Sequence, residues 1–155
     1  MKTKYIELYM DWAHRAAQLS HAKRLKVGAV IVKDDSVISY GYNGMPAGWD
    51  NNCEYEVINL QAEYGRRISP IKTGELRTRP EVLHAEMNSL MKLAKSSSSG
   101  NTASMFVTHS PCVECAKGIF QAGLKEVFYS EDYRDDSGLN FLRKSGVEVI
   151  KYPRN

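Results

Sequence analysis

Two short stretches carry side chains that could perform chemistry together. The first is His-Ala-Glu at 84–86, and the second is Ser-Pro-Cys-Val-Glu-Cys at 110–115. They supply one imidazole, two thiols and one carboxylate, which are groups that bind zinc and move protons. Three protein ligands leave a fourth tetrahedral position for water, as in a catalytic zinc site. We therefore predict that His84, Cys112 and Cys115 bind one zinc ion per chain.

Glu86 is predicted to carry protons and not to bind the metal. On a helix, residues two apart lie about 200° apart around the axis, so His84 and Glu86 cannot form an ordinary same-face ligand pair. A carboxylate beside a zinc-bound water can take its proton and pass it on. Glu86 is thus the candidate catalytic residue.

Each motif has other interpretations when it is read alone. A Cys-x-x-Cys pair can be a redox pair, half of a structural zinc knuckle or two buried small residues. In this sequence Pro111 favours a helix start, where exposed N–H groups and the positive end of the helix dipole stabilise thiolates. The combination gives a task to each of the four side chains, and it therefore indicates a zinc hydrolase.

Length and composition indicate a single domain over residues 1–155, with an irregular insertion at about 49–80. A net charge of +3 suits anionic ligands such as nucleotides but does not indicate DNA or RNA. No apolar run approaches the roughly 18 residues of a membrane span, and the first residues lack an apolar signal core. We expect a cytoplasmic protein with reduced thiols and with neither nucleic-acid nor membrane partners.

The first half of the chain predicts a helix followed by a hairpin. An apolar stripe over 4–20 indicates a helix, with His14 off the stripe and on the surface. The stripe residues, expected in the core, are Tyr5, Tyr9, Trp12, Ala13, Ala16 and Ala17. Strands are expected at 27–32 and 37–40 around a turn, followed by a glycine-rich loop at 41–48.

The insertion gives weaker signals. A short helix is expected from Tyr55, and its other apolar positions are Val57, Ile58, Leu60 and Tyr64. Four arginines suit either phosphate recognition or a solvated basic loop, and the sequence favours neither. They are Arg66, Arg67, Arg77 and Arg79.

In the second half of the chain, predicted helices alternate with predicted strands. Helices are expected from His84, after Pro111 and at 136–144, and strands at 103–108, 126–129 and 147–150. This alternation predicts parallel neighbours, with the zinc ligands at the carboxyl edge of the sheet. His109 is expected to make hydrogen bonds and not to be a fourth ligand, since the metal needs an open position.

The motifs together resemble those of the deoxycytidylate deaminases, within the cytidine deaminase-like superfamily. The resemblance extends roughly from Val27 to Ile150, and the length and insertion look most like the short phage and bacterial forms. The matching stretches are 27–31, 41–48, 84–88 and 110–115. The Gly-Tyr-Asn-Gly sequence at 41–44 separates this family from many relatives.

The resemblance implies a three-layer α/β/α sandwich around a five-stranded mixed sheet. It implies hydrolysis of dCMP to dUMP and ammonia, which feeds thymidylate synthesis. It also implies a homohexamer that dCTP activates and dTTP inhibits, with Mg²⁺ accompanying the dCTP.

The same resemblance assigns expected nucleotide contacts. Substrate is expected to contact Asn43 at its deoxyribose, Ala85 between the motif residues, and Arg24, Tyr133 and Arg134 near its phosphate. The regulatory nucleotide is expected at Asn43, Gly44, Gly48 and Lys26, at a subunit boundary. Some relatives hold a second zinc near the position of Cys53, which here lacks a Cys or His companion. A single zinc is therefore expected.

Three other functions remain open from the sequence. The first is a zinc deaminase of another substrate, such as adenosine in transfer RNA or free cytosine. The second is a deaminase-like domain that binds nucleotide or nucleic acid without catalysis, although the presence of Glu86 argues against it. The third is a structural zinc module, for which His109 is the nearest candidate for a fourth ligand.

Overall fold

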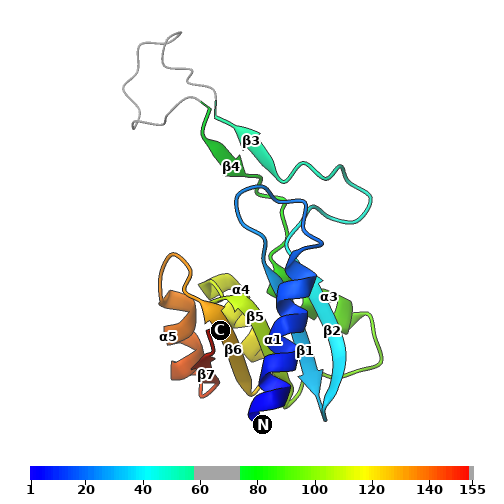
Figure 1. The fold of residues 1–155 in the computed structure, drawn as a ribbon, viewed down its shortest axis with the longest axis vertical. Coiled ribbons are helices and arrows are strands. Elements are labelled where there is room, and N and C mark those ends of the chain that lie inside the picture. Colours follow the sequence, from blue (N-terminus) through cyan, green and yellow to red (C-terminus); the bar gives the residue numbers. More distant parts are fainter. Residues whose placement is uncertain (58–73, 154–155) are drawn as a thin grey trace.

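A five-stranded mixed sheet forms the centre of the protein, with helices on both of its faces (Figure 1). The computed structural model describes residues 1–57 and 74–153. The strands of the sheet are β1 (Gly28–Lys33), β2 (Ser36–Tyr42), β5 (Ser104–His109), β6 (Glu126–Glu131) and β7 (Glu148–Lys151). The helices are α1 (Thr3–Ala17), α3 (Ala85–Ala94), α4 (Val113–Gln121) and α5 (Ser137–Lys144). No helix within these described ranges is long and apolar enough to cross a membrane.

The strand order confirms the predicted hairpin followed by parallel neighbours. The strands lie in the order β2-β1-β5-β6-β7, with β1 antiparallel to both of its neighbours. Strands β5, β6 and β7 run parallel to one another. At the predicted hairpin turn, Asp34 and Asp35 both have positive φ, at 48° and 57°. Such angles suit a tight two-residue hairpin connection.

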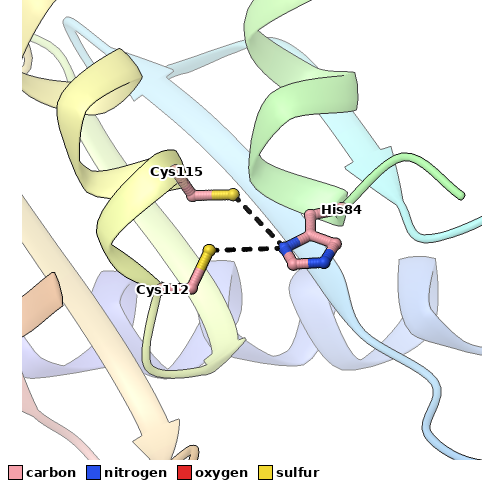
Figure 2. Close-up of side chains that lie close together, drawn as sticks. All are labelled: His84, Cys112 and Cys115. Carbon is pink, nitrogen blue, oxygen red and sulfur yellow. Dashed lines mark hydrogen bonds between the residues drawn. The ribbon is translucent and has the colours of Figure 1, made fainter. Parts of the chain in front are cut away.

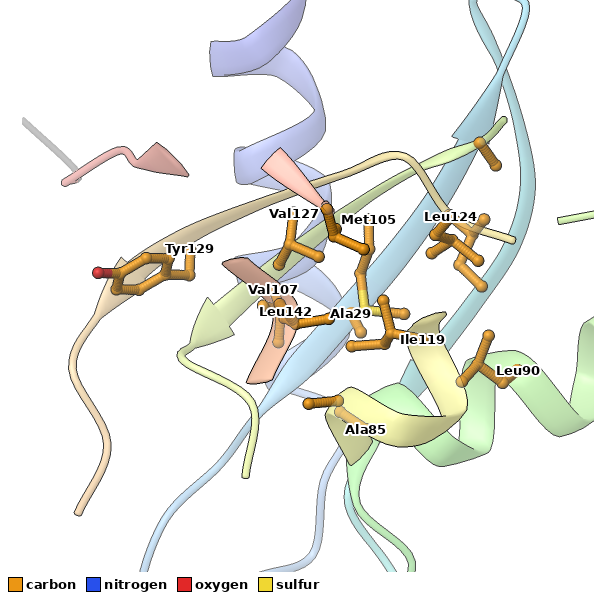
Figure 3. Close-up of a cluster of buried hydrophobic side chains, with 14 of the residues drawn as sticks. Ala29, Ala85, Leu90, Met105, Val107, Ile119, Leu124, Val127, Tyr129 and Leu142 are labelled. Atoms are coloured by element: carbon orange, nitrogen blue, oxygen red, sulfur yellow. The ribbon is translucent and has the colours of Figure 1, made fainter. Parts of the chain in front are cut away.

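Alternate residues of the central strands face two separate cores. In β1, Ala29 and Ile31 face the larger core under α3, α4 and α5, whereas Val30 and Val32 face the smaller core under α1. Figure 3 shows part of the larger core, where side chains of the strands meet those of α3, α4 and α5. Burial on both faces explains why these strands read as continuous apolar runs. The predicted three-layer α/β/α architecture is confirmed.

A two-stranded arm projects from the body, between β2 and α3 in the chain (Figure 1). Strand β3 (Glu54–Glu56) pairs antiparallel with β4 (Leu76–Thr78). The expected short helix is wrong where the structure describes it, because Tyr55 lies in β3 opposite Arg77. Three residues of that expected helix, Ile58, Leu60 and Tyr64, lie outside the described residues, as do Arg66 and Arg67.

Helix α1 covers the sheet, but two expectations about its side chains are wrong. Trp12 is 48% exposed and is not in the core, because it lines an open apolar groove with Leu19 and with Tyr40 of β2. His14 is half-buried and not on the surface, since Nε2 of its ring lies 3.0 Å from Oγ of Ser130 on β6. Helical periodicity marks the apolar side of a helix without showing how far the neighbouring sheet extends beneath it.

Candidate active site

The three predicted zinc ligands meet at the starts of two helices. His84 is the N-cap residue of α3, and Cys112 is the N-cap residue of α4, whose first turn carries Cys115. Nδ1 of His84 lies 3.5 Å from Sγ of each cysteine, and the three ligand atoms lie within 4.8 Å of one another (Figure 2). The helix begins at Val113, so Pro111 precedes the cap and does not occupy the first helical position.

This spacing suits a tetrahedral zinc ion. Bonds of about 2.3 Å to sulfur and about 2.0–2.1 Å to nitrogen place the two ligand atoms about 3.5 Å apart. The observed separations of Nδ1 from both sulfurs are 3.5 Å. Within the described part of the chain, no further His, Cys, Asp or Glu joins the group, and no such group surrounds the buried Cys53. The three side chains therefore fit a catalytic zinc with an open fourth position.

The two cysteines ionise unequally. Hydrogen bonds from Cys115 and His84 lower the pKa of Cys112 to about 3. The pKa of Cys115 is raised well above its ordinary value, because its thiol donates to Cys112 and is buried. The hydrogen bond with Cys112 also raises the pKa of His84. Even without a metal, the group therefore holds one thiolate, which is the form that binds zinc.

Glu86 lies beside the three predicted ligands and is not part of their group. It is in the first turn of α3, and its side chain is only 4% exposed. Burial raises the pKa of Glu86 to about 7, against hydrogen bonds from its own backbone and from Cys115 that favour the charged form. Its carboxylate lies outside the group of ligand atoms. A carboxyl group that titrates near neutral pH can both accept and release a proton.

Two glycines allow the elements that carry the site to approach closely. A Cβ on Gly138 of α5 would lie 2.0 Å from the backbone oxygen of Pro111, so α5 packs directly on the loop that presents Cys112. A Cβ on Gly41 of β2 would lie 2.3 Å from the backbone oxygen of Ala85 on α3. Neither position has room for a side chain, so only glycine allows this contact between backbones. The contact fixes where α3 and α4, which carry the predicted ligands, begin.

The glycine-rich loop is joined to the segment that precedes the histidine. Gly44 and Leu83 exchange two backbone hydrogen bonds, of 3.1 and 2.9 Å. Oδ1 of Asn43 accepts a hydrogen bond from the Val27 backbone at 2.8 Å, and its Nδ2 donates to the Leu25 backbone at 2.8 Å. Asn43 therefore ties this loop to the start of β1, and its contact with deoxyribose stays a prediction.

The structure places the remaining predicted nucleotide-binding residues in different surroundings. Ala85 is fully buried in the larger core, so a substrate contact there would have to use its backbone. Gly48, at a φ of 87°, and Lys26 are both exposed. Gly44 is half-buried. No interaction joins Lys26 or Gly48 to the ligand group among the described residues, and the regulatory site stays a prediction.

Tyr133 and Arg134 lie next to the ligands, in the loop between β6 and α5. Arg134 is close enough to His84 to lower the pKa of its imidazole, although the hydrogen bond to Cys112 outweighs this effect. The guanidinium of Arg134 lies 5.4 Å from the ring centre of Tyr133. The backbone N–H of Tyr133 donates to Oγ of Ser110 at 2.7 Å. The buried Ser110 thus anchors this loop beside the cysteines.

A polar cavity of about 720 Å³ brings Arg134 together with Arg24. It is lined by Arg24, Tyr55, Glu75, Arg77, Thr78, Pro80 and Arg134. The two arginines predicted near phosphate therefore share one cavity, although they are far apart in the sequence.

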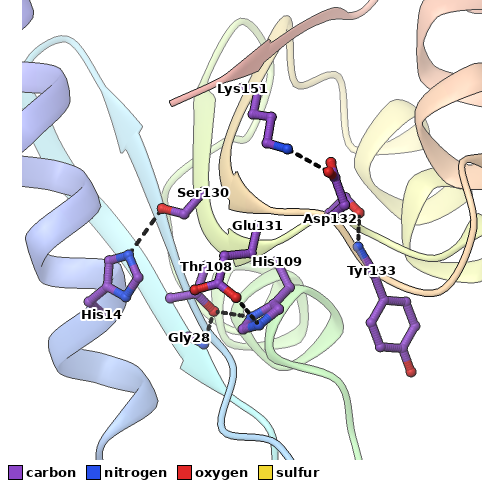
Figure 4. Close-up of polar contacts among 10 residues, drawn as sticks. His14, Gly28, Thr108, His109, Ser130, Glu131, Asp132, Tyr133 and Lys151 are labelled. Atoms are coloured by element: carbon purple, nitrogen blue, oxygen red, sulfur yellow. Dashed lines mark hydrogen bonds and ion pairs between the residues drawn. The ribbon is translucent and has the colours of Figure 1, made fainter. Parts of the chain in front are cut away.

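His109 makes hydrogen bonds, as expected, and is not among the grouped ligand atoms. Its Nδ1 lies 3.0 Å from Oγ1 of Thr108, and its Nε2 lies 3.4 Å from the carboxylate of Glu131 (Figure 4). The backbone N–H of Gly28 donates to the same Thr108 hydroxyl at 3.2 Å. Desolvation lowers the pKa of His109 despite the nearby Glu131. The geometry therefore gives no support to a structural zinc with His109 as fourth ligand.

Sequence reasoning missed two contributions to this region. Ser110 belongs to the cysteine motif, but nothing in the sequence indicates that its hydroxyl holds the backbone of Tyr133. Thr78 accepts a hydrogen bond from the guanidinium of Arg24 at 3.2 Å, and no pattern predicted that pairing across the chain. Both contacts depend on where loops return in space, which hydrophobic periodicity does not encode.

Fold and ligand group together define a protein of the cytidine deaminase-like class. A diaminohydroxyphosphoribosylaminopyrimidine deaminase/5-amino-6-(5-phosphoribosylamino)uracil reductase from Thermotoga maritima is 22% identical. The match covers 96% of this chain and 36% of that one, with a TM-score of 0.66. At that identity the likeness shows the fold alone. The family model described as the cytidine and deoxycytidylate deaminase zinc-binding region matches residues 3–131. The chain belongs to this family.

Several similar proteins within this family are deoxycytidylate deaminases. The deoxycytidylate deaminase of Enterobacteria phage T4 is 34% identical over 172 residues, covering 92% of this chain and 86% of the phage enzyme. The human deoxycytidylate deaminase is 40% identical over 133 residues, covering 84% of this chain and 67% of the human enzyme. A structure of the dCMP deaminase of cyanophage S-TIM5 with dCMP and dUMP is 43% identical, covers 98% of this chain and 99% of that one, and has a TM-score of 0.83.

Proposed function

We propose that this protein is a deoxycytidylate deaminase, which converts dCMP and water to dUMP and ammonia. The observation that carries the proposal is the His84, Cys112 and Cys115 group with the buried Glu86 beside it. The relatives named deoxycytidylate deaminase, including the cyanophage enzyme that binds dCMP and dUMP, support the choice of substrate.

His84, Cys112 and Cys115 would hold the zinc ion. When bound, zinc lowers the pKa of a water and makes it a nucleophile at neutral pH. Glu86 takes the proton of the attacking water and delivers it to the ring nitrogen next to the reacting carbon. The carbon–oxygen bond forms at the carbon that bears the amine. Glu86 then takes the proton of the new hydroxyl group and passes it to the amine. The carbon–nitrogen bond breaks, ammonia leaves, and the hydroxyl oxygen becomes the carbonyl oxygen of dUMP.

The residues that bind the phosphate and the sugar of dCMP are proposed from the position of the polar cavity. Arg24 and Arg134 line one polar cavity beside the ligand group, and forked guanidinium donors suit phosphate oxygens. Tyr133 lies against Arg134. We assign these three residues to the phosphate end of dCMP, and Asn43 to its deoxyribose.

Regulation and assembly form a finer part of the proposal. On the family resemblance, we propose a homohexamer that dCTP activates with Mg²⁺ and that dTTP inhibits, with the regulatory nucleotide near Asn43, Gly44, Gly48 and Lys26. The product dUMP would feed thymidylate synthesis. A cytoplasmic location fits thiol ligands that must stay reduced.

The deciding experiment follows the loss of cytosine absorbance with dCMP, with and without dCTP and Mg²⁺. The zinc-loaded protein should convert dCMP, and dCTP should raise the rate. Turnover that is indifferent to dCTP would retain the enzyme and remove the regulatory site. A zinc-loaded sample that leaves dCMP unchanged in both conditions would overturn the proposed function and direct the search to adenosine in RNA.

A further inference from the structure

The polar cavity beside the site is lined by three arginines from three separate parts of the chain. Arg24 precedes β1, Arg77 belongs to β4 of the arm, and Arg134 lies between β6 and α5. Against these three cations the lining holds one carboxylate, Glu75. The lining of this open cavity of about 720 Å³ therefore carries an excess of positive charge.

Arg77 is held in this position because the arm is attached to the loop that carries Arg24. A carboxylate oxygen of Glu54 on β3 accepts the backbone N–H of Arg24 at 3.1 Å. The guanidinium of Arg24 donates to Oγ1 of Thr78, the neighbour of Arg77, at 3.2 Å. Tyr55 and Arg77 lie directly opposite each other in the two strands, so both side chains leave the same face of the arm. These contacts fix Arg77 and Arg24 at the same cavity.

Arg134 lies both at this cavity and near the predicted zinc ligands. Arg134 lines the cavity and also lies close to the ligand His84. A ligand whose base reaches the zinc group can thus extend its other end toward Arg77. A phosphate monoester carries about −1.5 to −2 charges at neutral pH and accepts paired hydrogen bonds from guanidinium groups.

We propose that Arg77, together with Arg24, binds the 5′-phosphate of the substrate, so that the β3–β4 arm makes the enzyme select nucleotides over nucleosides. This inference rests on the proposed function, since it assumes that dCMP is the substrate. Arg77 is then a specificity residue at the far end of the substrate and has no part in the proton transfers of Glu86.

The test compares dCMP with deoxycytidine, which lacks the phosphate, in the zinc-loaded full chain. Arg77→Gln should lower kcat/KM for dCMP by about 10- to 100-fold, chiefly through KM, because a charge-assisted hydrogen bond is lost. The rate with deoxycytidine and the zinc content should not change. Arg143→Gln, which removes an exposed arginine of α5, is the matched control and should leave both rates unchanged.

Calorimetry of dUMP and deoxyuridine gives a readout that needs no turnover. Arg77→Gln should weaken dUMP binding by about 10- to 100-fold and leave deoxyuridine binding unchanged. Glu75→Gln should strengthen dUMP binding, because it removes the one carboxylate of the cavity. Equal weakening of both ligands by Arg77→Gln would overturn the proposal, since it would mean that Arg77 only supports the fold.

Two further results separate this inference from the function on which it rests. A second bound dUMP per chain that alone responds to Arg77→Gln, with no effect on dCMP turnover, would overturn the inference and assign the cavity to a regulator. An inactive wild type would overturn the proposed function. In that case the dUMP and deoxyuridine affinities still decide whether Arg77 recognises phosphate.

Discussion

Glu86 combines two properties that rarely occur together, since it is buried and yet ionisable near neutral pH. Desolvation favours its neutral form, while the neighbouring His84 and a hydrogen bond from Cys115 favour the charged form. The balance leaves the carboxyl group able to gain and lose a proton during turnover. No exposed carboxylate on the surface could do this equally well, because its ordinary pKa lies far below the working pH.

Replacement of this carboxylate separates proton transfer from metal binding. Glu86→Gln should keep about one zinc per chain and lower kcat for dCMP by about 100-fold or more, because the amide cannot carry a proton. Metal analysis and initial rates on the same sample give both values. Glu114→Gln changes an exposed carboxylate of α4 and should keep full activity. Loss of zinc in Glu86→Gln would show that Glu86 is a ligand.

The pKa of Glu86 also predicts how pH affects the metal-free protein. In the folded protein its pKa is about 7, whereas the ordinary value is 4.5. Between these values the unfolded chain releases a proton that the folded chain retains, so ionisation favours the unfolded chain as pH rises. The free energy of unfolding should fall by about 3 kcal/mol from this group between pH 4.5 and 7.

Urea unfolding of chelated, reduced protein measures this effect against Glu86→Gln. The variant should exceed the wild type in stability by about 3 kcal/mol more at pH 8 than at pH 4. Groups that do not interact with Glu86 titrate alike in both proteins, so the comparison reports Glu86 together with its interactions with His84 and Cys115. The same difference between the two proteins at both pH values would contradict the buried, neutral carboxyl group.

Among the elements, α5 has the least obvious part in the site. It supplies none of the predicted ligands, yet Gly138 lets its backbone rest against the Pro111 carbonyl, just before the predicted ligand Cys112. Ser110, on the other side of Pro111, holds the loop of Tyr133 through its hydroxyl group. The start of α4 is therefore fixed by contacts from both sides, as groups behind a metal site commonly fix its ligands.

Addition of one methyl group tests the role of α5. Gly138→Ala should weaken zinc binding by about 10- to 100-fold, because the new Cβ would displace the Pro111–Cys112 backbone. A competition titration with a zinc chelator measures the affinity. Asn140→Ala, at an exposed position of the same helix, controls for helix propensity and should bind zinc normally. Normal affinity in Gly138→Ala would show that the close packing does not position the ligand.

Elements differed in how well the sequence predicted them. The sequence predicted that His84, Cys112, Cys115 and Glu86 would lie together, because zinc-dependent chemistry requires particular side chains in a fixed order. The strands of the sheet were predictable because they are continuous apolar runs. The helices were predictable because their apolar residues recur at helical spacing. The arm was not, because strands of three residues such as β3 and β4 are too short for alternation to appear. Arg77 and Thr78 could not be assigned to the Arg24 cavity before that pairing was known.

At the scale of the molecule, a bound zinc would connect two helices that the chain separates. Its ligands belong to the starts of α3 and α4, which flank β5 in the sequence. Because the unfolded chain lacks this arrangement, metal affinity adds to the free energy of unfolding. His84 and Cys112, two of the predicted ligands, are N-cap residues without a side-chain capping hydrogen bond, so a bound metal would stabilise these helix starts where other helices use a cap.

Removal of the metal should therefore lower the melting temperature. With free zinc at 100 times its dissociation constant, the gain is about 2.7 kcal/mol, which raises Tm by about 5–10 °C for a chain of this size. Melting curves under reducing conditions, with chelator or with zinc, measure the shift. Cys115→Ser should show little response to zinc. A wild-type Tm that ignores zinc would argue against a bridging metal.

The backbone pairing of Gly44 with Leu83 has an evolutionary consequence. The chain leaves the body and returns to it at one point, so the segment between them can change in length or sequence without moving His84. The arm can therefore evolve separately from the active site. Selection can alter what the arm recognises while the residues that carry out the reaction keep their positions. The same closed loop offers an exchange point at which arms of related enzymes can be grafted.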